Sequence, residues 1–175
     1  RSAVLAGLTD AAMAAVSAGL GSLDPTMAPS CTYAAAVIVP SSGGTAEITV
    51  GNVGDSRVYW LPGPPEPAQC LTVDDSLAQE LITAGVPADS EAVLAGAHTL
   101  TRWLGADAKP TPWSESSVRT ITAERGLLVM CTDGLWNYLP EADDIARLCS
   151  GSDAAASARV LVDYALHAGG QDNIT

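Results

Sequence analysis

The fold is decided by residues 32–50, which read TYAAAVIVPSSGGTAEITV. Residues 32–39 form a continuous apolar and partly β-branched run, which is typical of a buried strand. Residues 40–44, Pro-Ser-Ser-Gly-Gly, have the composition of a turn. Residues 45–50 alternate between polar and apolar side chains, as a half-buried strand does. Two strands joined by a short turn predict a β-hairpin and therefore an antiparallel sheet.

Outward from this hairpin, strands and helices gather in separate parts of the chain. We expect further strands at residues 56–61 and 127–131. Apolar spacing, capping residues and Gly or Pro stops predict helices at residues 4–20, 76–84, 140–148 and 152–168. We expect irregular loops at residues 24–30, 62–67 and 87–117. Because the strands do not alternate regularly with the helices, the sequence predicts an α+β fold with antiparallel strands.

The composition indicates one globular domain over residues 1–175 and excludes several classes of protein. Hydrophobic residues make up 47% of the chain, which is enough for a core and rules out a disordered chain. Lys and Arg number 8 and Asp and Glu number 20, so the net charge is −12. This charge argues against a nucleic-acid partner, since phosphate backbones are bound by basic surfaces. No run reaches the roughly 18–20 apolar residues of a membrane helix, so we expect no membrane partner.

The 4 cysteines are widely spaced, and no pair forms a metal-binding or redox motif. Free cysteine behaves as a small buried hydrophobic residue, and free thiols are typical of a reducing compartment. The sequence therefore predicts unpaired cysteines and a cytoplasmic location.

Three aspartates stand apart from the other acidic residues by their position. Asp55, Asp133 and Asp172 each lie at the end of a regular element, beside a glycine. Aspartates that converge from separate elements can bind a hard cation such as Mg²⁺ or Mn²⁺. Each one taken alone is better explained as a turn residue that accepts backbone hydrogen bonds. The two interpretations differ in whether the three side chains meet in space.

Five short motifs follow one another along the chain: Gly51-Asn-Val-Gly-Asp-Ser-Arg57, Leu71-Thr-Val-Asp-Asp-Ser76, Leu100-Thr-Arg-Trp-Leu-Gly105, Cys131-Thr-Asp-Gly-Leu-Trp136 and Gly169-Gly-Gln-Asp-Asn-Ile-Thr175. This ordered set resembles the signature motifs of the protein phosphatase 2C family, which are metal-dependent serine/threonine phosphatases. The resemblance covers nearly the whole chain. It implies an antiparallel β-sandwich flanked by helices, in four layers ordered α/β/β/α, with a metal centre at one end.

The resemblance also implies a site and a reaction. Asp133 and Asp172 match ligands of two Mn²⁺ or Mg²⁺ ions, and Asp55 matches a ligand of a weaker third ion or a residue just behind the metals. Two such ions lower the pKa of a bridging water and neutralise the phosphoryl oxygens during attack. The implied activity is hydrolysis of phosphoserine and phosphothreonine in proteins. The implied partners are phosphorylated proteins and a cognate serine/threonine kinase.

Further residues are expected close to the metals or the phosphate. Gly134 and Asn173 adjoin the two matched ligands in the sequence, and Arg57 and Arg102 lie inside the family motifs. Each arginine has two interpretations, a bidentate contact with phosphate or an ion pair with one of the nearby carboxylates. We favour the ion pairs, because the family's substrate arginine lies elsewhere in its motifs.

The chain departs from the family at its first motif. The family's Asp-Gly-x-Gly element, whose Asp bridges both metals, is absent from the 175 residues, as are the upstream Arg and His that belong with it. Either these parts belong to a longer protein, which we favour because the sandwich would otherwise be incomplete at both ends, or the protein is a catalytically inactive phosphatase-like binding domain. In both cases we expect this span alone to bind metal weakly and to turn over poorly.

Two side-chain types have simpler expected roles. His98 falls in the region where the family has a flap beside the active site, and a lone loop histidine is most simply solvated. The tryptophans are expected to pack in the core. Neither is expected to take part in the chemistry.

Overall fold

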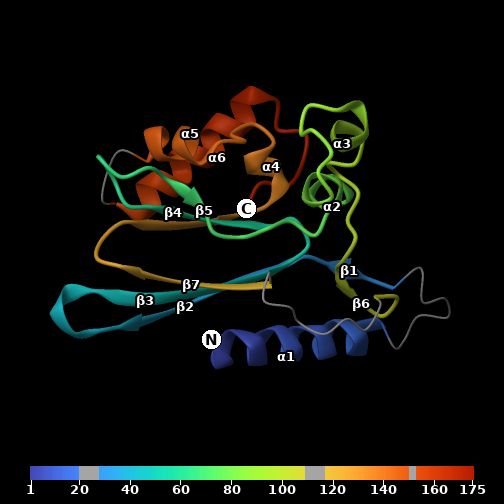
Figure 1. Cartoon of the computed structure of the whole chain (residues 1–175), viewed down its shortest axis with the longest axis horizontal. Helices are drawn as coiled ribbons and strands as arrows, with labels where there is room; N and C mark the ends of the chain where they lie inside the picture. The colour runs from blue at the N-terminus through green and yellow to red at the C-terminus, as the bar shows by residue number, and fades with distance from the viewer. Residues whose placement is uncertain (20–27, 109–116, 150–152) are drawn as a thin grey trace.

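The structure is a computed structural model that describes residues 1–19, 28–108, 117–149 and 153–175. Figure 1 shows four layers, with helix α1 (Ser2–Gly19) below two sheets that lie face to face. Helices α5 (Ala142–Leu148) and α6 (Ala154–Ala168) cover the outer face of the second sheet. This arrangement confirms the predicted α+β sandwich with the layer order α/β/β/α.

Each sheet has three antiparallel strands in the part of the chain that the structure describes. The first, in spatial order, consists of β2 (Tyr33–Pro40), β3 (Ala46–Val53) and β7 (Val118–Ala123). The second consists of β5 (Gln69–Cys70), β4 (Arg57–Leu61) and β8 (Leu127–Cys131). A separate short pair joins β1 (Ser30–Cys31) to β6 (Leu104–Gly105). The remaining helices are α2 (Leu77–Thr83), α3 (Glu91–Ala95) and α4 (Asp133–Trp136).

The hairpin predicted at residues 32–50 is present, since β2 pairs with β3 along its whole length. Gly43 and Gly44 have φ angles of 81° and 84° in the connecting turn, a conformation that glycine adopts without steric cost. β3 is the central strand of its sheet, whereas β2 lies at the edge. Ile38 and Val39 of β2 are 55% and 51% exposed. The prediction of a buried strand is wrong for the C-terminal end of β2, where side chains are exposed. An edge strand has a neighbouring strand on one side only, so less of it is covered.

Two short turns carry the chain from the first sheet to the second. Residues 54–56 join β3 to β4, and residues 124–126 join β7 to β8. β4 and β8 then pair antiparallel, with Arg57 opposite Cys131. The start of β4 and the end of β8 therefore lie side by side at one end of the sandwich. This geometry brings the turn at residues 54–56 close to the residues that follow Cys131.

Apolar side chains fill the spaces between the layers in three clusters. Between α1 and the first sheet the buried residues are Val4, Leu8, Val53, Leu104 and Val118. Between the sheets they are Ile48, Val50, Val58, Leu71 and Ala123. The outer cluster, between the second sheet and the helices, includes Tyr59, Leu61, Leu135, Trp136, Ile145 and Leu161. Burying one such large apolar side chain contributes about 1.5–3 kcal/mol, so the layers are held together mainly by these contacts.

Helix α1 confirms the helix predicted near the N-terminus, although Leu20 lies outside the described residues. By length and composition alone, its 18 residues could cross a membrane. In the structure Val4 and Leu8 are buried against the first sheet, while Met13 and Val16 are 65% and 43% exposed. The face that packs on the sheet is thus narrower than the apolar pattern predicted.

Most other predicted elements are confirmed within one or two residues. α2 begins after Ser76, whose side chain accepts a hydrogen bond from the backbone N–H of Gln79, as predicted. α6 ends at Gly169 and Gly170, which have φ angles of 150° and 55°. All 4 cysteines are free in the structure, where Cys131 and Cys149 are buried and Cys31 is exposed.

The prediction of an irregular region at residues 87–117 is wrong in part. It contains helix α3, capped by Ser90, and strand β6, while residues 109–116 lie outside the described part of the chain. Strand β7 and the single turn of α4 were also not predicted. Elements of two to five residues are too short to display a helical or strand period, which explains why α3, α4 and β6 escaped the pattern.

Candidate active site

Asp55 lies in the turn that crosses from β3 to β4. The turn is closely held, because Gly54 has a φ of 90° and a Cβ there would lie 2.5 Å from Cγ2 of Thr32. The same Thr32 side chain also holds the end of the turn, since its hydroxyl is hydrogen-bonded to that of Ser56 at 2.7 Å. Asp55 itself is only 8% exposed. The fold therefore holds this carboxylate in one place, as the sequence position between two strands suggested.

Asp133 is the first residue of α4 and follows β8 directly. The α4 turn is packed closely, since Gly134 and Leu135 are buried and a Cβ on Gly134 would overlap the carbonyl oxygen of Asn173. Only glycine permits this approach of the C-terminal segment. Gly134 thus has a structural role beside Asp133, at the place where the sequence predicted it.

The structure brings Asp55 and Asp133 together. The pKa of Asp55 is raised above its ordinary value, first by burial and then by the negative charge of Asp133. A buried carboxylate whose charge is disfavoured by a neighbouring carboxylate is a group that a bound cation would stabilise in its charged form. The nearby thiol of Cys131 is not expected to bind a cation in place of the carboxylates. Burial raises the pKa of Cys131 to about 12 and keeps the thiol neutral.

Asp172 lies on the exposed segment after α6, where Asn173 donates its backbone N–H to the Asp172 Oδ1 at 2.7 Å. This segment runs beside the start of α4. The Thr132 hydroxyl donates to the carbonyl oxygen of Asn173 at 3.0 Å, and the Thr132 N–H donates to the carbonyl oxygen of Thr175 at 3.2 Å. The tail thus brings Asp172 and Asn173 to the end of the sandwich that carries Asp133, as the motif order implied.

The residues fit a divalent cation only in part. Asp55 and Asp133 supply two neighbouring oxygen donors of the kind that Mg²⁺ and Mn²⁺ prefer. In the described part of the chain, however, no three His, Cys, Asp or Glu side chains gather closely enough to hold a metal ion. Asp172 is near the pair through its backbone contacts but does not complete a ligand cluster with it.

Arg57 is held by a carboxylate at this end of the sandwich. Its Nε and Nη2 donate to both oxygens of Asp74, at 2.7–3.2 Å. Burial lowers the pKa of Arg57, but the hydrogen bonds and charge of Asp74 outweigh burial and leave the pKa above its ordinary value. The guanidinium also lies 3.8 Å from the centre of the Trp136 ring. The ion-pair interpretation of Arg57 is therefore the one that the geometry favours.

Arg102 is paired in the same way with the next carboxylate. Its Nε and Nη2 each lie 3.0 Å from an oxygen of Asp75, and Nη2 also donates to the Ser117 hydroxyl at 2.6 Å. Asp75 additionally accepts the backbone N–H of Gly54 at 3.0 Å. Arg102 thus braces the Asp55 turn through Asp75. Sequence reasoning missed this role of Asp74 and Asp75, although two adjacent acids close to two motif arginines were a visible signal.

Trp136 joins α4, the helix that begins with Asp133, to the backbone of Asp55, and it was predicted only as a packing residue. It is 6% exposed, which confirms the packing role, but its Nε1–H also donates to the carbonyl oxygen of Asp55 at 2.9 Å. The imidazole of His98 stacks against the same indole, with ring centres 6.3 Å apart and planes 8° from parallel. His98 is exposed, as expected, but it is not merely solvated.

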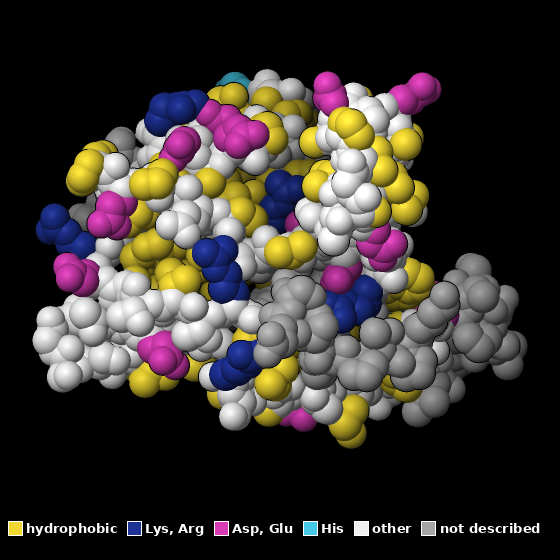
Figure 2. Space-filling view, in the orientation of Figure 1, with side chains coloured by type: hydrophobic (Ala, Val, Ile, Leu, Met, Phe, Trp, Pro, Cys, Tyr) yellow, Lys and Arg dark blue, Asp and Glu magenta, His cyan; other side chains and the backbone are white. Residues whose placement is uncertain are grey.

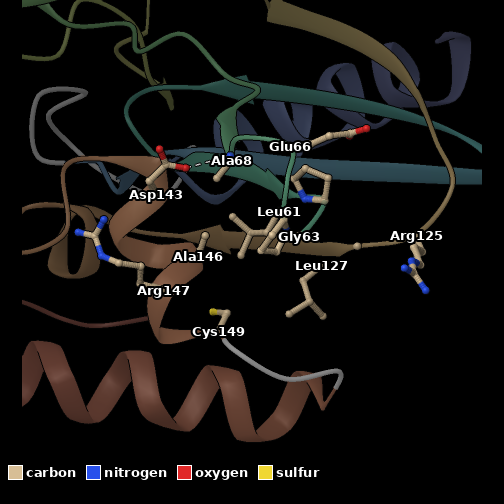
Figure 3. A pocket seen from close by; sticks show the side chains of 13 residues that line it. Leu61, Gly63, Glu66, Ala68, Arg125, Leu127, Asp143, Ala146, Arg147 and Cys149 are labelled. Atoms are coloured by element: carbon tan, nitrogen blue, oxygen red, sulfur yellow. Dashed lines mark hydrogen bonds between the residues drawn. The ribbon is translucent and has the colours of Figure 1, made fainter.

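Two further features of the molecule are its surface charge and a large pocket away from this site. On the face in Figure 2, Asp and Glu side chains alternate with Lys and Arg rather than forming a patch of one sign, which suits the predicted role of most carboxylates in solvation. A pocket of about 920 Å³ opens at the other end of β4 and β8, beside Leu61 and Leu127 (Figure 3). No predicted site residue lines that pocket, so it is separate from the carboxylate site.

The sequence and structure are similar to those of known phosphatases. The family model "Protein phosphatase 2C" matches residues 89–174. The serine/threonine phosphatase stp of Listeria innocua is 32% identical over an alignment of 151 residues that covers 82% of this chain and 54% of that protein. The chain therefore spans about half the length of the curated relatives it matches.

Solved structures show the same likeness in three dimensions. The serine/threonine phosphatase of S. agalactiae superposes with a TM-score of 0.73 and 28% identity, covering 97% of this chain and 66% of that one. The catalytic domain of the phosphatase PstP, solved in complex with 2 manganese ions, superposes with a TM-score of 0.59 and 26% identity over 79% of this chain and 54% of that one. With the ordered motifs and the four-layer sandwich, these likenesses establish that the chain belongs to the protein phosphatase 2C family.

Proposed function

We propose that the protein hydrolyses phosphoserine and phosphothreonine in proteins, using water activated by Mn²⁺ or Mg²⁺. Asp133 and Asp172 would be ligands of two ions, and Asp55 would hold a weaker third ion or lie just behind the pair. When bound, the ions would lower the pKa of a water molecule and neutralise the phosphoryl oxygens. The observation that carries the proposal is the meeting of Asp55 and Asp133 at the end of the sandwich where the Asp172 segment docks.

The chain's own residues would hold the carboxylates and leave the arginines occupied. Trp136 binds the Asp55 backbone, and Thr132 binds the segment that carries Asp172. Arg57 is bound to Asp74 and Arg102 to Asp75, so neither guanidinium neutralises Asp55 and Asp133 as an ion-pair partner. Cations are then the natural counter-charge for the two carboxylates, and they would allow an acidic protein to bind an anionic phosphate.

The proposed partners follow from the proposed reaction. Phosphorylated proteins would be the substrates, and a serine/threonine kinase would supply them. We also propose a cytoplasmic location, because free thiols are typical of a reducing compartment.

The decisive experiment measures phosphate release from a phosphothreonine peptide by the full natural protein. Activity should require Mn²⁺ or Mg²⁺, should be lost with EDTA, and should fall at least about 100-fold in Asp133→Asn. Asp10→Asn, on the exposed face of α1, is the matched control and should keep full activity. Turnover that survives EDTA or Asp133→Asn would overturn the proposal.

A second candidate function is a phosphatase-like binding domain without turnover. The 175 residues contain no Asp-Gly-x-Gly element, and Asp133-Gly134 is the sole Asp-Gly pair in the chain. Sequencing the gene upstream of the codon for Arg1 separates the two functions, since an Asp-Gly-x-Gly motif there would support the enzyme. A protein that binds the phosphopeptide but releases no phosphate with Mn²⁺ would support the binding domain instead.

The span of residues 1–175 by itself is expected to bind Mn²⁺ weakly, because the described residues supply no cluster of three ligands. Titration calorimetry on this span should therefore show no tight site. A sub-micromolar dissociation constant would show that these residues complete the site unaided.

A further inference from the structure

The segment from Ser76 to Thr101 is a closed excursion that carries α2 and α3. Its two limbs meet at the base, where Ser76 forms an antiparallel bridge with Leu100 and the Leu77 N–H donates to Thr99 at 2.8 Å. The two helices also bind each other, since the Ala78 N–H donates to the carbonyl oxygen of Gly96 at 3.2 Å. The excursion therefore has its own internal contacts and can be treated as one unit (Figure 1).

The base of the excursion is tied to the turn that carries Asp55. The Asp75 N–H donates to the Gly54 carbonyl oxygen at 2.9 Å, and the Gly54 N–H donates to the Asp75 carboxylate at 3.0 Å. On the returning limb, the Thr101 N–H donates to the Asp75 carbonyl oxygen at 2.9 Å, and Arg102 pairs with the Asp75 carboxylate. Through Asp75, both limbs are fixed to one side of the site.

His98 gives the returning limb a contact with the other side of the site. Its imidazole is stacked almost parallel on the Trp136 indole, at 6.3 Å between ring centres. Trp136 belongs to α4, the turn that begins with Asp133, and it also binds the backbone of Asp55. The His98 ring therefore touches the residue that joins α4 to the backbone of Asp55.

The burial of the two rings differs, and the difference indicates which ring depends on the other. Trp136 is 6% exposed and is held by the outer core cluster, by the Asp55 carbonyl oxygen and by Arg57. His98 is exposed and lies just beyond α3, and its ring stacks on Trp136. Removing the His98 ring should loosen the excursion and leave the core in place, since aromatic stacking contributes beyond the area it buries.

We propose that His98 is a positioning residue of this site. It holds the returning limb of the excursion against Trp136 and so fixes the position of that limb beside Asp55 and Asp133. The positioning role of His98 rests on the proposed function only where it concerns the effect of losing His98 on turnover. His98 touches no carboxylate of the site, so its loss should weaken substrate binding more than it slows the chemical step. Trp136 holds the Asp55 backbone, so its loss should also lower kcat.

The first test is amide hydrogen exchange on the full natural protein, which needs no activity. In His98→Ala, the amides of Leu77, Thr99 and Thr101 should exchange about tenfold faster, while those of β8 should be unchanged. His98→Phe keeps an aromatic ring for the stack and should restore slow exchange. Leu94→Ala, which removes a side chain that is 65% exposed on the same excursion, is the matched control and should change nothing at the base.

The second test is a kinetic comparison of the same variants on a phosphothreonine peptide. His98→Ala should raise KM about five- to tenfold with kcat within about twofold, and His98→Phe should restore KM. Unchanged exchange in His98→Ala, or equal acceleration in Leu94→Ala, would overturn the proposal. If no variant turns over but His98→Ala still loosens the base and His98→Phe restores it, the positioning role stands and the proposed hydrolysis fails.

Discussion

Two parts of the site are held in different ways. Asp55 lies in a buried turn between two sheets and its backbone is bound by Trp136, a core residue. Asp172 lies on an exposed segment that is attached to the sandwich through hydrogen bonds to Thr132 and by close packing against Gly134. The first carboxylate is positioned by the core itself, and the second by a few surface contacts.

Because of this difference, substitutions in the two parts of the site should affect different properties of the protein. Changes in the buried half of the site should alter the free energy of unfolding, because they remove core contacts or create strain. Changes in the exposed segment should alter the position of Asp172 with little effect on stability, because few buried contacts depend on it. The predictions below test this separation, beginning with the largest effect.

Trp136→Ala should lower the free energy of unfolding by about 3–5 kcal/mol, since it empties a buried site in the outer core cluster and removes the hydrogen bond to Asp55. Trp136→Phe should cost less, about 1–2 kcal/mol, because it keeps most of the apolar contact. Asp172→Ala should change stability by less than about 0.5 kcal/mol. Urea denaturation of the three variants measures the differences, and an equal cost for Asp172→Ala and Trp136→Ala would remove the distinction.

Gly54→Ala should destabilise the protein by about 1–3 kcal/mol, because its φ of 90° is strained for alanine and the new Cβ would lie 2.5 Å from Thr32. Gly43→Ala is a matched control with a similar φ of 81° and no atom within 4 Å of the new Cβ. It should cost only the conformational part, about 1 kcal/mol. Thermal unfolding of the two variants gives the contribution of close packing at the Asp55 turn, and equal melting temperatures would contradict it.

Asp55→Asn should stabilise the metal-free protein at pH 7, because it removes a buried charge that the charge of Asp133 also disfavours. Burial and the charge of Asp133 raise the pKa of Asp55 in the folded state above its ordinary value of 3.8. The folded state therefore holds this proton more tightly than the unfolded state, and stability falls as pH rises from about 3.8 through the raised pKa.

The pH dependence of urea unfolding tests this sign. The advantage of Asp55→Asn should be present at pH 7 and should shrink as pH falls toward 3, where Asp55 is protonated in both states. A loss of stability in metal-free Asp55→Asn at pH 7 would contradict the electrostatic account of the buried half.

Gly134→Ala should displace the segment that carries Asn173, because the new Cβ would overlap the backbone carbonyl oxygen of Asn173. The amide of Thr175, which is bonded to the Thr132 hydroxyl at 3.3 Å, should then exchange faster. Exchange in β8 should stay unchanged. A large loss of stability would show that the segment is part of the core rather than attached to it.

Much of the fold could be predicted from the chain because its elements carry local signals. The hairpin at residues 32–50, the Ser76 cap and the Gly169-Gly170 stop each depend on neighbouring residues, and all three are present. The edge position of β2 could not be predicted, because exposure depends on which strands lie on either side. Ile38 and Val39 were therefore expected in the core although both are more than half exposed.

The candidate site could be predicted in its residues but not in its contacts. Asp55, Asp133 and Asp172 were singled out by their positions after regular elements, and the motif order grouped them. The Asp74 and Asp75 pairs with Arg57 and Arg102, and the two contacts of Trp136, join residues 17–81 positions apart. A pairing over such distances leaves no periodic signal in one sequence.

By itself the sequence determined the hairpin and the three aspartates through local patterns, and it determined the layer order through motifs that resemble those of a known family. The tertiary structure alone decided that Asp55 and Asp133 are neighbours, that Asp172 lies on an exposed segment, and that His98 stacks on Trp136. The physical reason is the antiparallel pairing of β4 with β8, which brings the start of one strand to the end of the other across about 70 residues of chain.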